Sequence, residues 1–428
     1  MARRDRLSGN EAVAEALRQI NPDVMAAFPI TPSTEIPQYF SKLVANGKVD
    51  SEFIPVESEH SAMSAVIGAE AAGARSVTAT SSAGMALMWE ELYLASSNRL
   101  PCVLTLVNRA LSGPININCD HSDSMGARDA GWIQIYAENN QEVYDNLVMA
   151  YRIGEHKDVM LPVMICQDGF ITSHAVENIN LLEDKEVKDF VGEYEPENYL
   201  LNPECPMAVG PYSVSNYYFE AKRAQAEALK NAKQVTLDVA KEYKEISGRE
   251  YGLFEEYKME DAEEAVVIIG SAAGTTKDAV DELRAQGKKV GLIKIRLFRP
   301  FPGSEIADAL KNVKAVALMD RTESYNDCCG PIGSEVTTAL YRAKSDCLAV
   351  NYVYGLGGRD VKVEDMINVY SELEKIAEAG EVTEPYRYMG VREYGGAFQC
   401  IILKSLSAEK SVLQAATECV QAAAVQSQ

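Results

Sequence analysis

Short apolar runs alternate with amphipathic segments along the first part of the chain. An uninterrupted apolar run predicts a buried strand, and apolar residues at helical spacing predict a helix that covers the sheet. This alternation is typical of a parallel sheet with helices on both faces. The strands are expected at 24–28, 53–56, 77–80, 102–107 and 162–166, and the helices at 12–20, 34–46, 59–73, 85–97 and 141–154.

A second alternating unit follows a charged connector. Residues 185–215 contain several prolines and predict irregular structure, and residues 216–246 predict a long helix. Further apolar runs predict the strands of another parallel sheet, at 265–270, 290–295 and 315–319. We therefore predict an α/β protein with two parallel-sheet domains, residues 1–250 and 251–390, and a tail, 391–428, with one amphipathic helix.

The chain is strongly acidic, with 41 Lys and Arg against 63 Asp and Glu and a formal net charge of −22. Nucleic acid and anionic membrane surfaces are therefore not expected as partners, because few cations are available to neutralise phosphates. No apolar run approaches the roughly 18 residues that cross a bilayer. The basic start of the chain lacks the apolar stretch of a signal peptide. We expect a cytoplasmic protein.

The nine cysteines form no C-x-x-C pair, and only Cys328 and Cys329 are adjacent. A chain of this length needs no disulfide framework, and iron–sulfur clusters require closely spaced cysteines. We therefore expect no disulfide scaffold and no cluster ligands, which agrees with a reducing compartment.

A hydroxyl group flanked by prolines follows the first predicted strand, in segment 28–33 (FPITPS). The prolines exclude regular structure, so Thr31 stays at the strand's carboxyl end, where open α/β sheets bind ligands. A stiff turn without function is the alternative. The segment resembles the Tyr-Pro-Ile-Thr-Pro-Ser motif of the 2-oxoacid:ferredoxin oxidoreductases. The resemblance implies that Thr31 binds substrate and that Phe28, Pro29 and Ile30 line the active site, with Phe28 in place of the family's tyrosine.

Glu59 lies where a predicted strand turns into a helix of small residues. A carboxylate in the first helical turn interacts favourably with the helix dipole, so a simple cap is one interpretation. Segment 58–62 also resembles the family's Ser-Glu-x-x-Ala motif. The resemblance implies that Glu59 is catalytic and contacts N1′ of the aminopyrimidine of thiamine diphosphate. It also implies cofactor contacts from Ser82 and Gly84, although an ordinary tight turn explains loop 81–84 equally well.

Arg109 ends an otherwise apolar predicted strand. A guanidinium group pairs bidentately with carboxylates and would suit the acid group of a 2-oxoacid. A surface arginine that closes a strand is the alternative. Segment 108–110 resembles the family's strand-end motif, which implies that Arg109 binds the substrate.

The loop after this strand brings Asp120, His121 and Asp123 together in the sequence. Such a group raises the question of a metal site, but the side chains are crowded and no distant ligand is evident. We predict no metal here. The segment resembles the family's Gly-Asp-His-x-Asp motif, except that Cys119 replaces the glycine. The resemblance implies that Asp120 and His121 line the active site or contact another subunit.

The resemblance covers about residues 8–390 and implies a thiamine diphosphate pyrimidine-binding domain followed by a transketolase C-terminal-like domain. The family's magnesium–diphosphate signature and cluster cysteines are missing from the sequence. The resemblance therefore implies an alpha subunit. Beta, gamma and delta subunits or domains are then expected to supply Mg²⁺, the other half of the thiamine diphosphate site and [4Fe–4S] clusters.

The implied reaction is the reversible oxidative decarboxylation of a 2-oxoacid with coenzyme A, which yields an acyl-CoA and carbon dioxide and reduces ferredoxin. Pyruvate is the substrate expected first. A branched-chain 2-oxoacid, 2-oxoglutarate or oxalate stays open, because Phe28 makes the pocket less polar. Further alternatives are a thiamine-dependent dehydrogenase or transketolase-like subunit and a scaffold subunit without catalysis.

Overall fold

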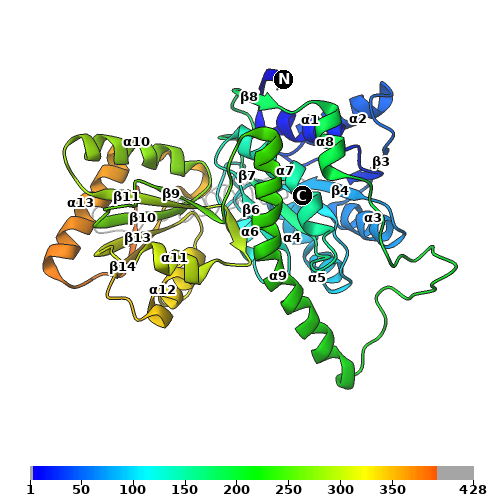
Figure 1. The fold of residues 1–428 in the computed structure, drawn as a ribbon. Coiled ribbons are helices and arrows are strands. Elements are labelled where there is room, and N and C mark those ends of the chain that lie inside the picture. The colour runs from blue at the N-terminus through cyan, green and yellow to red at the C-terminus, as the bar shows by residue number, and fades with distance from the viewer. Residues whose placement is uncertain (1–2, 393–428) are drawn as a thin grey trace, which may run out of the picture. The chain divides into compact units, whose positions relative to one another are not determined.

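The structure is a computed structural model that describes residues 3–392 (Figure 1). Its largest sheet contains β2 (Val24–Ala27), β3 (Glu52–Pro55), β4 (Ser76–Thr80), β5 (Val103–Asn108), β6 (Ile133–Tyr136), β7 (Val163–Asp168) and β12 (Leu297–Arg299). The strand order is β12-β6-β7-β5-β4-β2-β3. All neighbours are parallel except β12, which pairs antiparallel with β6.

Helices cover both faces of this sheet because its strands are apolar on both sides. In β5, for example, Val103 and Val107 face one apolar core, whereas Leu104 and Leu106 face the other. The helices are α1 (Gly9–Ile20), α2 (Glu35–Ala45), α3 (Glu59–Ala71), α4 (Ser82–Leu87), α5 (Trp89–Ser97), α6 (Ser122–Gly126), α7 (Asn140–Gly154) and α8 (Asp184–Val191). The first core packs on α1, α2 and α7, and the second on α3 and α5.

A six-stranded sheet follows, in the order β15-β14-β13-β10-β11-β9. Its strands are β9 (Phe254–Tyr257), β10 (Glu264–Ile269), β11 (Val290–Ile295), β13 (Ala315–Asp320), β14 (Leu348–Val353) and β15 (Tyr386–Tyr388). Its helices are α10 (Ala272–Ala285), α11 (Gly303–Ala309), α12 (Pro331–Ala343) and α13 (Val363–Ala379). Residues of β10 and β11 share one apolar core with residues of the first sheet, so the two sheets are packed together.

The α/β class and the two parallel sheets are thus confirmed, with several local corrections. The helix predicted over 85–97 is two helices, α4 and α5, separated at Met88. The stretch predicted as irregular begins with α8, whose Val187, Phe190 and Val191 are buried. Strands β6, β9, β12, β14 and β15 were not predicted from the sequence. The antiparallel pair of β1 (Arg3–Leu7) and β8 (Glu177–Leu181) was not predicted either.

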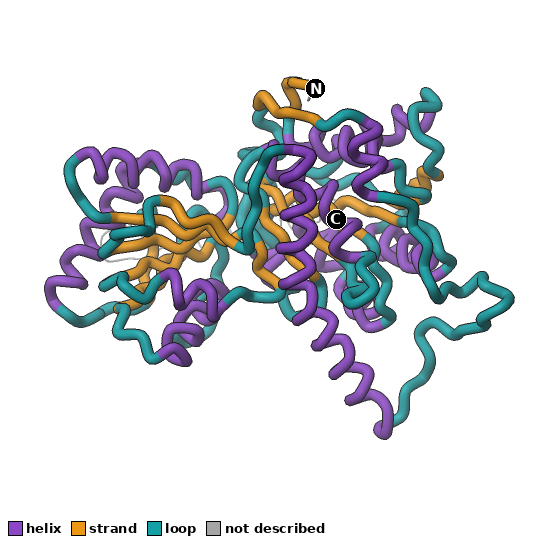
Figure 2. The backbone as a smooth tube through the Cα atoms, in the orientation of Figure 1, coloured by secondary structure: helices purple, strands orange, loops and turns teal. Residues whose placement is uncertain are grey.

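The predicted connector helix is α9 (Ser215–Ser247), and its second half packs on α7. Small residues such as Ala232 and Ala240 are buried there and allow close approach of the two helices. The first turns of α9 and the loop before it extend away from the sheet (Figure 2). Three large aromatic side chains in these turns are exposed: Tyr217, Tyr218 and Phe219.

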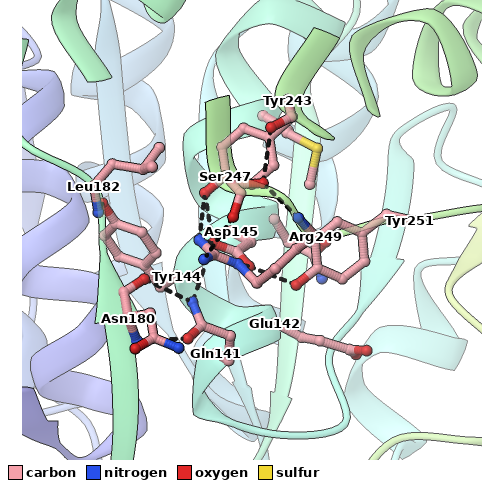
Figure 3. A network of polar contacts seen from close by, with 12 residues as sticks. Gln141, Glu142, Tyr144, Asp145, Asn180, Leu182, Tyr243, Ser247, Arg249 and Tyr251 are labelled. Carbon is pink, nitrogen blue, oxygen red and sulfur yellow. Dashed lines mark hydrogen bonds and ion pairs between the residues drawn. The ribbon is translucent and has the colours of Figure 1, made fainter. Parts of the chain in front are cut away.

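A buried carboxylate fastens the end of α9 to α7 (Figure 3). The side chain of Asp145 has no exposed surface and accepts hydrogen bonds from the hydroxyl groups of Tyr243 and Tyr251, each at 2.5 Å. Arg249 donates to the same carboxylate through Nε at 2.6 Å and Nη2 at 2.7 Å. Asp145 thereby holds α7, α9 and the segment that leads to the second sheet in one arrangement.

The two sheets are also joined through the backbone. β12 comes from the second half of the chain but pairs with β6, with Leu297 opposite Ile135. The domain limits at residues 250 and 390 stay a prediction. The amphipathic helix predicted in the tail lies outside the described residues. Within the described part of the chain, no helix has the length and apolar character needed to cross a membrane.

Candidate active site

The predicted site residues lie at the carboxyl ends of four neighbouring strands, β3, β2, β4 and β5. Thr31 follows β2, and Glu59 begins α3 just after β3. Ser82 and Gly84 follow β4, and Arg109 follows β5. Because these strands are parallel, their carboxyl ends share one edge of the sheet, where ligands of such folds bind.

The structure brings Arg109 and Thr31 together. Arg109 Nη1 donates to the backbone oxygen of Thr31 at 2.9 Å, and Nε donates to the backbone oxygen of Asn116 at 3.1 Å. The arginine is 7% exposed, and its Nη2 makes no hydrogen bond within residues 3–392. The Thr31 residue itself is exposed. The guanidinium group is therefore fixed in orientation and keeps a donor for an anionic ligand.

Asp123 links this arginine to the loop after β4. Its Oδ2 accepts hydrogen bonds from the backbone N–H groups of Arg109 and Ser82, both at 2.9 Å. Its Oδ1 accepts from the Asn108 amide at 2.8 Å. Burial raises the pKa of Asp123 to about 6, and the N–H donors act in the opposite direction. Asp123 was singled out in the sequence, but its role in joining the loops after β4 and β5 was not predicted, because that role depends on contacts between residues far apart in the sequence.

Ser82 adopts a left-handed conformation, with φ of 46°, that residues with a Cβ atom rarely take. Two interactions hold it there. Its N–H group bonds to Asp123, and its hydroxyl donates to the backbone oxygen of Ala110 at 2.5 Å. Both of its donors are thus used within the chain, so Ser82 shapes the loop, while its hydroxyl oxygen can still accept a hydrogen bond.

Glu59 and Gly84 form a second part of the site. Glu59 is 6% exposed, and its carboxylate makes no hydrogen bond within residues 3–392. A Cβ atom at Gly84 would lie 2.7 Å from Glu59 Oε1, so only glycine can pack this closely on the carboxylate. The buried hydroxyl oxygens of Thr80 and Ser81 also lack partners among the described residues. Buried polar atoms normally have hydrogen-bond partners. The Glu59 carboxylate and the two hydroxyl groups therefore favour the binding of a polar ligand, such as a heteroaromatic ring with N–H groups.

Replacing Gly84 by alanine should destabilise the protein by about 1–3 kcal/mol, because the new methyl group must displace the Glu59 side chain. Denaturant unfolding of the purified protein measures this change. Gly68→Ala in α3 is the control, since a Cβ atom there would have no neighbour within 4 Å among residues 3–392, apart from the backbone of its own helix. The control should be neutral or slightly stabilising. Equal behaviour of the two variants would contradict the tight packing of Gly84 on Glu59.

His121 lies in a buried network that joins the two halves of the chain. Its Nε2 is 2.8 Å from Asp168 Oδ1, at the end of β7. Asp168 Oδ2 accepts from Arg321 Nη1 at 3.0 Å and from the hydroxyl of Ser271 at 2.5 Å. Burial alone would raise the pKa of Asp168, but the charges and hydrogen bonds of His121 and Arg321 hold it well below its usual range.

Asp120 also reaches the second half of the chain. Its Oδ1 accepts from the Ser122 hydroxyl at 2.6 Å, and its Oδ2 accepts from the Gly357 N–H at 3.3 Å, in the 3₁₀ turn η1 (Leu356–Gly358). Asp120 and His121 therefore lie at the junction between the sheets. Their position in the wall of an active site stays a prediction. The same holds for the predicted wall residues Phe28, Pro29 and Ile30, which follow β2.

Ligand atoms of Cys119, His121 and Asp168 lie within 4.8 Å of one another, which is close enough for a metal ion. Several features favour a structural network instead. His121 and Asp168 bond to each other, and the cationic Arg321 already contacts Asp168. Burial raises the pKa of the Cys119 thiol well above its usual value, whereas metals bind the thiolate.

A second acidic group, Glu138, Glu142 and Glu255, also has ligand atoms within 4.8 Å of one another. Lys294 lies between these carboxylates and forms ion pairs with all three. Lys277 adds ion pairs with Glu138 and Glu255. Two ammonium groups thus occupy the position that a cation would take.

Two family models match the chain. Residues 15–241 match the thiamine diphosphate-binding domain of pyruvate flavodoxin/ferredoxin oxidoreductase. Residues 262–366 match core domain II of pyruvate:ferredoxin oxidoreductase. Among solved structures, 2-oxoglutarate:ferredoxin oxidoreductase from Magnetococcus marinus has a TM-score of 0.65 at 20% sequence identity. That likeness covers 86% of this chain and 65% of the other, and it shows the fold alone.

Curated relatives are similar over nearly their whole length. Pyruvate synthase subunit PorA of Thermotoga maritima is 52% identical over 387 residues, which are 90% of this chain and 98% of the relative. PorA of Methanocaldococcus jannaschii is 46% identical over 86% of this chain and 94% of the relative. Ketoisovalerate oxidoreductase subunit VorA of Pyrococcus horikoshii is 43% identical over 88% and 95%. The chain belongs to the pyruvate flavodoxin/ferredoxin oxidoreductase family.

Proposed function

We propose that this chain is the alpha subunit of a pyruvate synthase, which converts pyruvate, coenzyme A and oxidised ferredoxin reversibly into acetyl-CoA, carbon dioxide and reduced ferredoxin. The observation that carries the proposal is the 52% sequence identity to the Thermotoga maritima pyruvate synthase subunit, which extends over 90% of this chain and 98% of that subunit. Family membership also argues against the dehydrogenase and transketolase-like alternatives. A scaffold subunit with the same fold stays an alternative that activity measurements test.

Glu59 is the proposed catalytic residue. When bound, thiamine diphosphate supplies the carbon nucleophile that attacks the keto group of the 2-oxoacid. The Glu59 carboxylate would hold and exchange a proton at N1′ of the aminopyrimidine. Its burial and its lack of a partner among the described residues support this role. Gly84 and Thr80 would border the same ring, because a Cβ atom at Gly84 would meet the side chains of both Thr80 and Glu59. The buried hydroxyl groups of Thr80 and Ser81, which lack partners among the described residues, would add polar contacts.

Arg109 and Thr31 are the proposed substrate-binding residues. The two backbone carbonyls that hold Arg109 orient its guanidinium group, and Nη2 would donate to the carboxylate of the 2-oxoacid. The exposed Thr31 would offer a hydroxyl group to the substrate from the neighbouring strand end. Ser82 would act mainly by shaping the loop between the two parts of the site.

Replacing Arg109 by lysine should lower kcat/KM for the 2-oxoacid by roughly 10- to 100-fold, since a charged hydrogen bond contributes about 1.5–3 kcal/mol. Lysine keeps the charge but loses the fixed planar fork. Steady-state kinetics of the assembled complex measure the effect. Arg99→Lys is the matched control, because Arg99 donates to the backbone oxygens of Val159 and Met160 near the opposite end of β5. Similar kinetics of the two variants would contradict the assignment.

The rest of the active site would come from other chains. We propose that beta, gamma and delta subunits or domains supply Mg²⁺, the diphosphate half of the cofactor site and [4Fe–4S] clusters, and that ferredoxin accepts the electrons. The sequence contains neither a magnesium–diphosphate signature nor a C-x-x-C pair of cysteines, which supports this division of the active site between chains. The isolated chain should therefore be inactive. A cytoplasmic location is part of this proposal.

A substrate survey of the native complex, purified through this chain, tests the function. Reduction of a viologen dye that depends on coenzyme A would be measured with pyruvate, 2-oxoisovalerate, 2-oxoglutarate and oxalate. Preference for pyruvate supports a pyruvate synthase. Preference for 2-oxoisovalerate would favour the second candidate, a branched-chain 2-oxoacid oxidoreductase, to which Phe28 and the VorA relative point. A complex without thiamine diphosphate and without activity would overturn both.

A further inference from the structure

The adjacent thiols of Cys328 and Cys329 are in contact, in the loop between β13 and α12. Their sulfur atoms lie 3.4 Å apart. Cys328 is exposed, whereas Cys329 is only 8% exposed. No other two thiols within residues 3–392 are in hydrogen-bond contact. Neither cysteine is among the proposed catalytic or binding residues.

Asn326 holds the reduced form of the pair in place. Its Oδ1 accepts hydrogen bonds from the backbone N–H groups of Cys328, at 3.2 Å, and Cys329, at 3.0 Å. The neighbouring Tyr325 has φ of 51° and is 93% exposed, so the turn is a tight one at the surface. A change in the backbone between the two cysteines would break the hydrogen bonds to Asn326.

The same loop lines a cavity of about 660 Å³ between the two halves of the chain. Asn326 and Tyr325 are part of its wall, together with Asn116 and Asp120. The backbone oxygen of Asn116 is one of the two that hold Arg109. The cavity wall thus contains Asn326, which bonds to the two cysteines, and Asn116, which bonds to the proposed substrate-binding Arg109.

We propose that Cys328 and Cys329 are a modification site at which a peroxide forms a reversible disulfide between adjacent residues. Cys328 is the thiol that reacts first with the peroxide, because it is exposed to solvent. Burial, with the hydrogen bond to Cys328 as a further cause, raises the pKa of Cys329 to about 12 and makes it the second thiol to react.

The Cys328 thiolate attacks one peroxide oxygen, the O–O bond breaks, and a sulfenic acid and water result once the leaving hydroxide takes a proton. The Cys329 sulfur then attacks the Cys328 sulfur, the S–O bond breaks, and a second water leaves with the thiol proton. Two electrons pass from the two sulfur atoms to the peroxide. A dithiol reverses the modification by returning two electrons.

Disulfide formation must reshape the loop. Cα atoms of adjacent residues are about 3.8 Å apart, whereas disulfides usually span about 4.4–6.8 Å between Cα atoms. The bond would close an eight-membered ring that contains the Cys328–Cys329 peptide group. Such a bond is strained and easily reduced, which suits a reversible modification.

Peptide mass spectrometry of the complex tests the site. After treatment with hydrogen peroxide, free thiols are blocked with iodoacetamide and the protein is digested with trypsin. The peptide 322–342, bounded by Arg321 and Arg342, contains both cysteines and no internal Lys or Arg. It should lose two hydrogens and take up no blocking group. Dithiothreitol added before blocking should restore two blocked thiols.

Variants separate this result from general thiol oxidation. In Cys329→Ser the same peptide should instead carry a sulfenic acid on Cys328, which dimedone traps. Oxidation of Cys205, an exposed cysteine elsewhere in the chain, shows whether the peroxide treatment was strong enough to oxidise an accessible thiol. Two blockable thiols in peptide 322–342 under conditions that oxidise Cys205 would overturn the proposal. Sulfinic acid on Cys328 with Cys329 still free would overturn it as well.

Discussion

Replacing Glu59 by glutamine should lower turnover of the assembled complex by roughly 10²–10⁴-fold, the usual contribution of a positioned acid–base group. The amide has nearly the same shape as the carboxyl group, so the cradle formed with Gly84 should stay intact. The amide cannot exchange a proton at the cofactor ring. Coenzyme A-dependent reduction of a viologen dye with pyruvate, together with the thiamine diphosphate content of the purified complex, measures both consequences.

The control is Glu57→Gln, two residues earlier. Glu57 is exposed and accepts a hydrogen bond from the Ser61 hydroxyl at 2.7 Å. The change in charge is the same, but Glu57 does not border the space beside Gly84. We expect nearly normal turnover from this variant. Normal turnover by Glu59→Gln, with the complex assembled and the cofactor bound, would contradict the catalytic role and favour a scaffold subunit.

Replacing Asp145 by alanine should reduce the free energy of unfolding by about 3–5 kcal/mol, the usual cost of removing one partner of a buried ion pair. The change leaves the guanidinium group of Arg249 and the hydroxyl groups of Tyr243 and Tyr251 without their common acceptor (Figure 3). Unfolding by urea, followed by circular dichroism, measures the loss.

Asp238→Ala is the matched control for this experiment, because Asp238 is an exposed aspartate of α9 whose carboxylate accepts its one hydrogen bond within residues 3–392 from Gln234, at 3.0 Å. Its effect should stay within about 0.5 kcal/mol. Turnover per folded complex should change little in either variant, since the residues that bond to Asp145, such as Tyr243, Arg249 and Tyr251, are not proposed site residues. A loss below about 1 kcal/mol for Asp145→Ala would show that α9 does not depend on this carboxylate.

The placement of the candidate site residues at strand ends could be predicted from the sequence because each follows a recognisable strand. Thr31, Glu59 and Arg109 come directly after apolar runs, and parallel strands bring such ends to one edge. The motifs around them are local, so no knowledge of distant contacts is needed. The structure confirms the strands, and it adds a contact between Arg109 and Thr31 that the sequence did not predict. It leaves the chemical roles of these residues as predictions.

Features that depend on distant contacts could not be predicted in this way. Asp168 and Arg321 are 153 residues apart in the sequence but form a buried ion pair. The break at Met88 has no proline or glycine to mark it, and α8 was missed because the stretch around it is rich in prolines and charge. Strands as short as β12 give too few residues for a periodic pattern.

The pairing of β12 with β6 has a consequence for the synthesis of this protein. A ribosome that has released residues 1–250 has exposed six strands of the first sheet but not residues 297–299. Until these emerge, β6 is an edge strand whose Tyr136 N–H group lacks its acceptor, the backbone oxygen of Arg296 at 2.8 Å. Unpaired edges template aggregation, so the nascent first half should be the stage most in need of chaperones.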